Sequence, residues 1–208
     1  GLSSTTYALP SALVLTSNLR RNFPDQLIIL GGSHANVSGR ETIDLYDEFD
    51  IVAVGSDGEY TALDIVRAYR ECKYNKRNFL TNHSVLSSID GIIYKRFNEL
   101  ITNRPRSLME NLDELPFPAR DLFPLERYVP LPNQYKKLPL TNMVVIRGCP
   151  YVCTFCDQAG TGARNRSPHK TVEEIRHVVR DYGIKEISFW DDTMSYNKKW
   201  MREFCEQL

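Results

Sequence analysis

Short apolar runs that end at glycine place the strongest limit on how this chain folds. Residues 27–30 precede Gly31 and Gly32, and residues 51–54 precede Gly55. Uninterrupted apolar runs are typical of strands buried on both faces, as in parallel sheets. Apolar residues at helical spacing predict helices over residues 10–23, 41–49 and 59–72. Strands that alternate with helices across short connections predict an α/β fold.

The pattern changes after about residue 75. Residues 75–88 are polar, and residues 91–94 and 99–101 flank a short turn, which predicts a hairpin. Residues 104–132 are rich in proline and charge, and closely spaced prolines disfavour both helix and central strand. We therefore expect a first domain over 1–90, then a hairpin and an extended proline-rich linker over 91–140 that packs along both neighbours.

A second α/β region is expected over 141–208. Residues 143–146 predict a buried strand, and a cysteine-rich loop follows. Thr171 and Glu174 have the spacing of a capping box, which predicts that a helix opens at Thr171 and closes at Gly183. A strand over 187–190 and an apolar helical stripe over 200–208 complete two βα units. Because two such units cannot close a barrel, we expect a fragment of a larger domain.

The composition limits the kinds of partner that this chain is expected to bind. Lys plus Arg and Asp plus Glu each number 26, so the formal charge is zero and neither nucleic acid nor an anionic membrane is expected. No apolar run approaches the roughly 20 residues that span a bilayer, and the first residues do not resemble a signal peptide. Five cysteines, three of them clustered, indicate metal or redox chemistry in a reducing cytoplasm rather than a disulfide framework.

The cysteine loop carries the most specific signal. Cys149, Cys153 and Cys156 can bind three irons of a four-iron cluster and leave one iron open for a chelating cofactor. Electron-transfer clusters and structural zinc sites usually take four ligands. A fourth ligand would have to come from a residue without a familiar zinc spacing, namely His169, Cys205 or Cys72. The alternatives are a non-catalytic zinc or iron–sulfur binding module, or three thiols without a ligand role. Cys72 and Cys205 are interpreted as packing residues.

Cys-x-x-x-Cys-x-x-Cys after a buried strand, with Phe155 just before the last cysteine, resembles the radical S-adenosylmethionine (radical SAM) superfamily. This resemblance implies a [4Fe–4S] cluster on the three cysteines, with S-adenosylmethionine on the open iron and Phe155 beside the cofactor. It also implies reductive cleavage to a 5′-deoxyadenosyl radical, a reductant such as flavodoxin or ferredoxin, and a small-molecule or peptide substrate that the sequence does not identify.

Two carboxylates follow the second strand of this region. Because successive parallel strands end at one edge, we expect Asp191 and Asp192 beside the cysteine loop. Many members of the resembled family have a Gly-Gly-Glu segment here that binds the methionyl amino group, whereas this chain has Trp-Asp-Asp-Thr. Either an aspartate contacts cofactor or substrate, or the pair is a solvated strand end or helix cap. Arg164 and Arg166 are expected to be solvated loop charges.

Three polar strand ends are predicted to share one edge of the first sheet, where ligands of open parallel sheets bind. Glycines there permit close backbone approach. The candidate ligand-binding residues at this edge are Ser4, Thr5, Gly31, Gly32, Ser33, His34, Gly55, Asp57, Gly58 and Glu59.

The order of these segments, with the linker Leu-Asp-Glu-Leu-Pro-Phe-Pro-Ala-Arg-Asp at 112–121, resembles radical SAM proteins with a preceding cobalamin-binding domain. The resemblance covers nearly the whole chain. It implies a partial Rossmann-like cobalamin-binding domain followed by the first two βα units of a partial TIM-type barrel. It also implies methyl transfer, radical rearrangement or cyclisation. The Asp-x-His-x-x-Gly motif, which supplies a histidine ligand to cobalt in some corrinoid proteins, is absent. His34 is therefore expected to be a loop histidine near a helix start, and no protein histidine is expected on the lower face of the cobalt.

Overall fold

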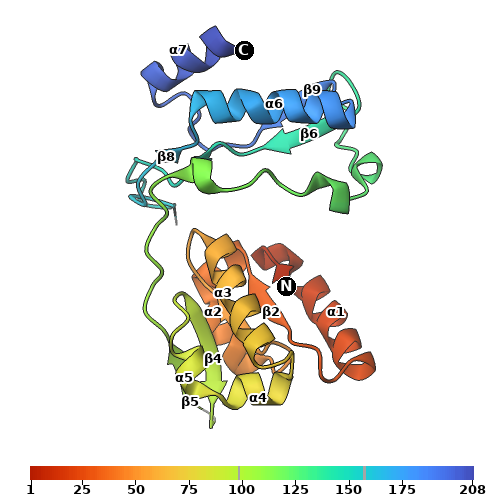
Figure 1. Ribbon diagram of the computed structural model, residues 1–208, viewed down its shortest axis with the longest axis vertical. Helices are drawn as coiled ribbons and strands as arrows, with labels where there is room; N and C mark the ends of the chain where they lie inside the picture. The colour runs from red at the N-terminus through yellow and green to blue at the C-terminus, as the bar shows by residue number, and fades with distance from the viewer. Residues whose placement is uncertain (98, 157) are drawn as a thin grey trace. The chain divides into compact units, whose positions relative to one another are not determined.

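The first part of the chain builds a five-stranded mixed sheet. The computed structural model describes residues 1–97, 99–156 and 158–208, which divide into two compact units, Gly1–Leu108 and Met109–Leu208. The strands of the first unit lie in chain order (Figure 1). They are β1 (Leu2–Ser3), β2 (Ile29–Gly31), β3 (Ile51–Ala53), β4 (Ile92–Arg96) and β5 (Glu99–Thr102). β1, β2 and β3 are parallel, and β4 and β5 are antiparallel to their neighbours.

The expected hairpin forms, but it is part of this sheet and not of the linker. β4 pairs with β3, with Ile51 opposite Tyr94 and Ala53 opposite Ile92. The first unit therefore extends to Leu108, past the boundary expected at residue 90. The physical reason is the apolar character of β4, whose first three residues are all buried and need cover on both faces.

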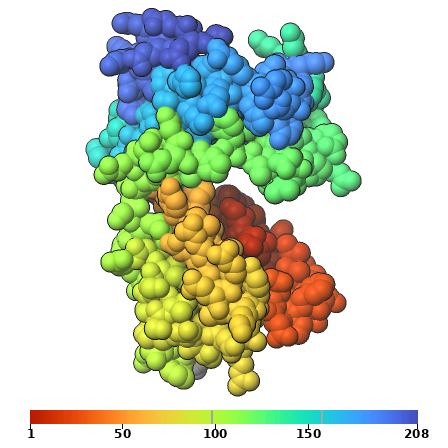
Figure 2. All heavy atoms as spheres, in the orientation of Figure 1, coloured from red at the N-terminus to blue at the C-terminus, as the bar shows by residue number. Residues whose placement is uncertain are grey.

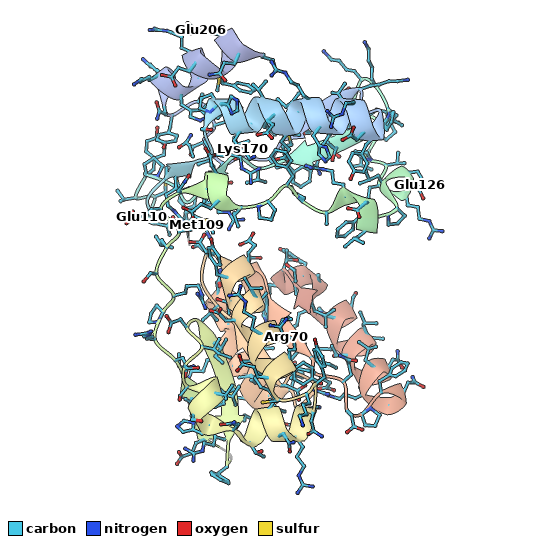
Figure 3. The ribbon with its side chains drawn as sticks, viewed as in Figure 1. Arg70, Met109, Glu110, Glu126, Lys170 and Glu206 are labelled. Atoms are coloured by element: carbon cyan, nitrogen blue, oxygen red, sulfur yellow. The ribbon has the colours of Figure 1, made fainter. Side chains whose placement is uncertain are left out.

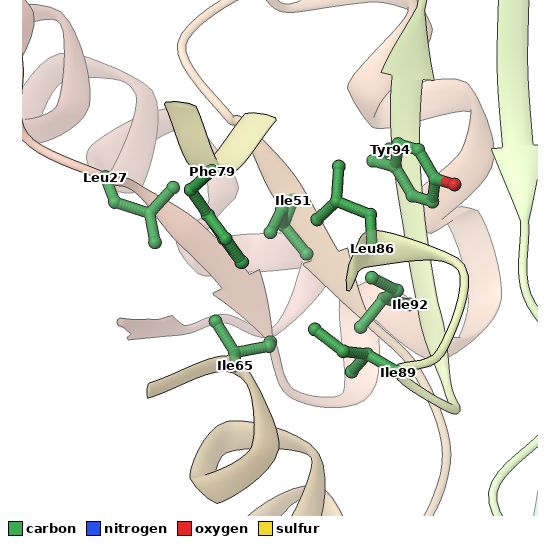
Figure 4. Close-up of a cluster of buried hydrophobic side chains, with 8 residues drawn as sticks. All are labelled: Leu27, Ile51, Ile65, Phe79, Leu86, Ile89, Ile92 and Tyr94. Atoms are coloured by element: carbon green, nitrogen blue, oxygen red, sulfur yellow. The ribbon is translucent and has the colours of Figure 1, made fainter. Parts of the chain in front are cut away.

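Helices cover both faces of the first sheet. η1 (Thr6–Ala8) leads into α1 (Leu9–Asn22), which lies on one face together with α2 (Ser33–Leu45). The opposite face carries α3 (Gly58–Glu71), α4 (Lys76–Thr81) and α5 (His83–Leu86). Because successive strand residues point to opposite faces, Ile51 joins the cluster shown in Figure 4 while Val52 joins the other.

Two helical boundaries in the first unit differ from the expectation. The helix expected at 41–49 begins at Ser33, directly after β2, because Gly32 adopts φ 90° and the His34 amide donates to the Ser4 carbonyl. The polar stretch 75–88 contains two short helices, α4 and α5. Asn75 and Asn82 cap them, and each helix buries one apolar residue.

The second unit holds two parallel strands, a short antiparallel pair and two helices. β6 (Leu140–Met143) pairs with β9 (Glu186–Phe189), and β7 (Ile146–Arg147) pairs with β8 (Arg164–Asn165). α6 (Pro168–Tyr182) packs on the β6–β9 pair, and α7 (Lys198–Gln207) packs on α6 (Figure 1). The single strand expected at 143–146 is therefore divided between β6 and β7.

α6 begins one turn earlier than the sequence suggested. Ser167 Oγ accepts a hydrogen bond from the Lys170 amide, and Pro168 occupies the first turn, so Ser167 is the N-cap. Thr171 and Glu174 lie inside the helix, and the expected capping box is wrong because the Glu174 carboxylate is buried and engaged elsewhere. Gly183 ends the helix at φ 64°, as expected.

The proline-rich linker belongs to the second unit from Met109 onward. It contains three turns of 3₁₀ helix, η2 (Leu112–Glu114), η3 (Arg120–Leu122) and η4 (Leu125–Arg127). In the space-filling view the linker and α6 form one packed surface (Figure 2). Among the described residues, no helix is both long enough and apolar enough to cross a membrane.

Candidate functional site

The cysteine loop is closed at its base by a two-stranded ladder. Ile146 pairs with Asn165, and Arg147 pairs with Arg164. Inside the loop, Thr161 Oγ1 accepts from the Cys149 amide at 3.1 Å and donates to the Gln158 carbonyl at 2.8 Å. These bonds fix the backbone at the first cysteine, so the loop leaves the sheet from a defined position.

Gly148 is required by this closure. Its φ is +76°, and an added Cβ would lie 2.0 Å from the Gly162 carbonyl oxygen. No real Cβ tolerates that distance, so the two ends of the loop pass each other only because Gly148 has no side chain. The sequence places this glycine next to Cys149 but does not reveal the contact.

The three thiols are free and differ in exposure. Cys149 is buried, Cys156 is half-buried and Cys153 is exposed. Over residues 1–97, 99–156 and 158–208, no three His, Cys, Asp or Glu side chains lie close enough together to hold a metal ion. The donor set itself fits a cluster that takes three thiolates, since all three sulfurs lie on one loop with a fixed base. Gathering them calls for closure of the exposed part of that loop, where Phe155 is 90% exposed.

Asp191 connects the end of β9 to the start of the cysteine loop. Its Oδ1 accepts from the amides of Val145 and Ile146, at 2.8 and 2.7 Å. Its Oδ2 is buried and lacks a hydrogen-bond partner within the described part of the chain. Burial raises the pKa of the Asp191 carboxyl, the two backbone hydrogen bonds oppose that rise, and neighbouring Asp192 adds a smaller one. Asp192 is exposed.

A buried ion triad, which the sequence reasoning missed, ties the linker to the cysteine-loop region. Arg120 Nη2 lies 2.7 Å from Glu174 Oε1, and Arg166 Nη1 pairs with Glu174 Oε2. All three side chains are less than 10% exposed. Arg120 also donates to Thr141 Oγ1 and to the Asn142 carbonyl.

Arg166 is therefore not the solvated loop charge that was expected. Its backbone amide donates to the Val145 carbonyl, and its carbonyl accepts from Trp200 Nε1 at 2.7 Å. Arg164 is half-buried and donates through Nη1 to the Met109 carbonyl. The one local signal for the triad was Arg120 itself, a charge directly after the apolar, proline-rich residues 115–119 of the linker.

Phe117 adds to the attachment of the linker. The His177 ring stacks on it at a centroid distance of 5.6 Å, and the Lys170 ammonium lies 4.7 Å from its centroid. Lys170 is labelled on the first turn of α6 in Figure 3, with Met109 at the start of the second unit. Together with the triad, this contact holds the linker against α6.

An open recess of about 700 Å³ lies between the linker and the β6–β9 pair. Its walls are mainly apolar and aromatic, and small-molecule sites have that size and character. The residues that line it are Phe123, Leu125, Arg127, Tyr128, Val129, Pro130, Gln134, Leu140, Thr141, Asn142 and Trp190.

In the first unit, the structure brings the predicted strand ends of β1 and β2 together. The Ser4 amide donates to the Gly31 carbonyl, and its own carbonyl accepts from the His34 amide, both at 3.0 Å. An added Cβ on Gly32 would lie 2.7 Å from the Ser4 nitrogen. Glycine is therefore needed here for close packing of the two strand ends. Thr5 and Ser33 remain exposed at this edge.

His34 is buried in the first turn of α2 and not in a loop. Thr42 Oγ1 donates to the Ser38 carbonyl, so its oxygen accepts from His34 Nε2 at 2.8 Å. His34 Nδ1 then accepts from Thr6 Oγ1 at 3.1 Å. Both ring nitrogens are occupied, so this histidine has no free nitrogen for a ligand.

The turn after β3 is the most open part of the same edge. Gly55, at φ +110°, donates its amide to Asn36 Oδ1, and an added Cβ on Gly55 or Gly58 would meet open space. Asp57 is buried, while Glu59 is exposed on the first turn of α3. This turn can therefore admit a ligand close to the backbone.

The two remaining cysteines have different surroundings. Cys72 is half-buried and packs against the first core, as expected. Cys205 is exposed, so its expected role in packing is wrong: it lies on the solvent side of α7, whose buried residues are Trp200 and Phe204.

Comparison with known proteins finds a family model that matches part of the second unit. Residues 143–207 match the Radical SAM superfamily. Over 202 residues the chain is 31% identical to an uncharacterized methyltransferase of Pyrococcus horikoshii, covering 96% of this chain and 40% of the relative. It is 28% identical to the anaerobic magnesium-protoporphyrin IX monomethyl ester cyclase of Synechocystis sp., covering 100% of this chain and 39% of the cyclase.

Solved structures of similar fold include the radical S-adenosylmethionine methyltransferase TsrM from Kitasatospora setae. One TsrM structure, with tryptophan substrate and a SAM analog bound, has a TM-score of 0.64 at 16% identity and covers 94% of this chain and 36% of TsrM. Another, with cobalamin and a [4Fe-4S] cluster bound, has a TM-score of 0.63. At this identity the likeness concerns the fold alone.

The match to the Radical SAM superfamily covers residues 143–207, with the cysteine motif near the start of that segment. Its relatives at the level of sequence carry the names of a methyltransferase and of cyclases. The chain spans about 40% of the length of the Pyrococcus horikoshii and Synechocystis relatives.

Proposed function

We propose that the chain is part of a radical SAM enzyme that also uses cobalamin, acting in methyl transfer or in radical rearrangement or cyclisation. The observation that carries this proposal is the triplet Cys149, Cys153 and Cys156 on a loop with a fixed base, inside a segment that matches the superfamily. A bound [4Fe–4S] cluster with one open iron would supply the electron that cleaves S-adenosylmethionine to a 5′-deoxyadenosyl radical.

The chain's own residues have four tasks in that reaction. Thr161 and Gly148 fix the backbone around Cys149, so that the first thiolate is held in place. Phe155 offers an apolar ring that, with the loop closed, excludes water from the cofactor. Asp191 Oδ2 is a buried acceptor without a partner within the described residues, which suits the amino group of S-adenosylmethionine. Asp192, exposed beside it, would face the substrate.

The first unit would hold the cobalamin along the carboxyl edge of its parallel strands. The exposed side chains of Thr5, Ser33 and Glu59 and the open space at Gly55 and Gly58 fit a large ligand lying against the backbone. Since both nitrogens of His34 are engaged, the cobalt would have no ligand from that histidine. The recess next to Trp190 suits the substrate, a small molecule in keeping with its size.

Anaerobic reconstitution with iron and sulfide tests the proposal. We expect a brown protein whose reduced electron paramagnetic resonance spectrum changes when S-adenosylmethionine is added. Serine at Cys149, Cys153 or Cys156 abolishes iron binding, whereas serine at Cys72 or Cys205 leaves it unchanged. Stoichiometric zinc and no spectral change would instead indicate the non-catalytic metal-binding module.

The cobalamin part has its own test on the full-length protein. We expect a corrinoid absorption band that persists through gel filtration, and a cobalt(II) spectrum without splitting from a protein nitrogen. A His34→Ala protein should give the same cobalt spectrum. A colourless protein after loading and gel filtration would contradict this part alone.

A further inference from the structure

The ladder between β6 and β9 stops at Met143, before β7 and the cysteine loop. Its last pair is Met143 with Phe189, and the Trp190 amide still donates to the Met143 carbonyl at 2.9 Å. The ladder continues no further among the described residues. Val145 and Ile146 are buried there, and their amides need acceptors that the ladder no longer supplies.

Asp191 supplies the missing acceptor. One carboxylate oxygen, Oδ1, accepts from both amides, across a separation of 46 and 45 residues in the chain. A buried amide without an acceptor costs about 1–3 kcal/mol, and hydrogen bonds to a charged group are stronger than neutral ones. The aspartate thus closes the backbone where a strand partner is absent.

We infer that Asp191 is a positioning residue for the cysteine loop: its carboxylate fixes the backbone at Val145 and Ile146, from which β7 leads to Cys149. Asp191 acts through hydrogen bonds to the backbone, so the three thiols stay free to bind their ligand. This inference rests on the proposed function in one respect, that the loop is the one that binds the cluster. The two hydrogen bonds themselves are present in the chain without a cluster.

Amide hydrogen exchange of the metal-free chain, followed by NMR, tests this inference. In Asp191→Ala the amides of Val145 and Ile146 lose at least about tenfold in protection, as expected for loss of a hydrogen bond to a charged group. In Asp191→Asn the side-chain amide oxygen can still accept the two hydrogen bonds, so the loss of protection is about threefold or less. Asp192→Ala is the matched control and leaves both amides unchanged. The Val178 amide, inside α6, reports separately on the fold of the unit.

Unchanged protection of both amides in Asp191→Ala would overturn the inference. If that variant does not fold, the wild-type chain decides, because the amide proton shifts of Val145 and Ile146 must follow the ionisation of Asp191. The absence of any response would overturn it equally.

Iron content after reconstitution is measured on the same proteins and separates this inference from the proposed function. We expect wild type and Asp191→Asn to bind similar iron and Asp191→Ala less. Normal loading of Asp191→Ala would count against the positioning role. If no protein binds iron while the exchange result holds, the proposed function fails and the backbone role of Asp191 stands.

Discussion

At the scale of single residues, the second unit depends on side chains whose partners lie far along the chain. Glu174 is the clearest case, since it pairs with Arg120 in the linker and with Arg166 after the cysteine loop. Two cations and one anion are buried there, so removing the anion leaves positive charge without compensation. Gly148 acts in the opposite way: it has no side chain, and this lets its backbone pass close to the Gly162 carbonyl.

Glu174→Gln should destabilise the second unit by about 3–5 kcal/mol, the cost typical of breaking a buried ion pair from one side. Urea denaturation followed by tryptophan fluorescence measures this, since Trp200 lies beside Arg166. The neighbouring Glu173→Gln is the matched control, because Glu173 pairs with Lys170 at the surface. Equal midpoints for the two variants would contradict the role given to the triad.

Gly148→Ala should cost about 1–3 kcal/mol more than Gly162→Ala, because overlap with backbone is added to the strain of a positive φ. Both glycines have a φ near +75°, but an added Cβ on Gly162 meets nothing within 4 Å. Thermal unfolding of the two variants gives the difference. Equal melting temperatures would show that the loop ends separate easily.

At the scale of elements, α6 organises the second unit. Its N-terminus is held by Ser167, whose own amide donates to Asp113 Oδ1 in the linker at 2.8 Å, and Gly183 ends it. One face packs on Met143 and Ile184 through Val178. Asp181, in the last turn, is the wrong charge for the negative end of the helix dipole, so it depends on neighbouring cations.

The Asp181 carboxyl should titrate with a pKa of about 2. The hydrogen bond from Arg180 lowers its pKa most, and His177 contributes less. Because the folded pKa lies below the ordinary value, the pairing stabilises the fold above pH 3.8 and is lost as pH falls toward 2. NMR titration of the carboxyl carbon measures this. Arg180→Gln should raise the midpoint, whereas Lys185→Gln should leave it unchanged.

At the scale of the whole molecule, the chain consists of two units that meet in sequence at Leu108 and Met109. The first has its own sheet with a core on each face. The hairpin β4–β5 contributes Ile92 and Tyr94 to one core and Ile93 to the other. Removing the hairpin would therefore open both cores and expose the edge of β3.

Residues 1–108 should accordingly fold alone, whereas residues 1–90 should not. The longer piece should unfold in one cooperative transition, measured by circular dichroism against urea. The shorter piece, cut where the domain boundary was first expected, lacks the partner strand of β3 and should give no such transition. Cooperative unfolding of residues 1–90 would show that the hairpin is an addition to the fold and not part of it.

Local sequence patterns were sufficient to predict several elements of this protein. The apolar runs ending at glycine predicted the buried strands β2 and β3, and the spacing of Cys149, Cys153 and Cys156 predicted the superfamily whose model matches residues 143–207. The turn between residues 91 and 101 predicted the hairpin. Each of these features depends on neighbours within a few residues, where periodicity and turn chemistry act directly.

The tertiary structure decided the rest, because the deciding contacts join residues far apart in the chain. Burial of Arg120 and of Arg166 requires Glu174, and the break between β6 and β7 requires Asp191. The state of His34 follows from Thr6 and Thr42 on either side of it. From its neighbours in sequence alone, a charged side chain is expected to be solvated. Burying it costs desolvation free energy, and only an opposite charge that folding brings close can offset that cost.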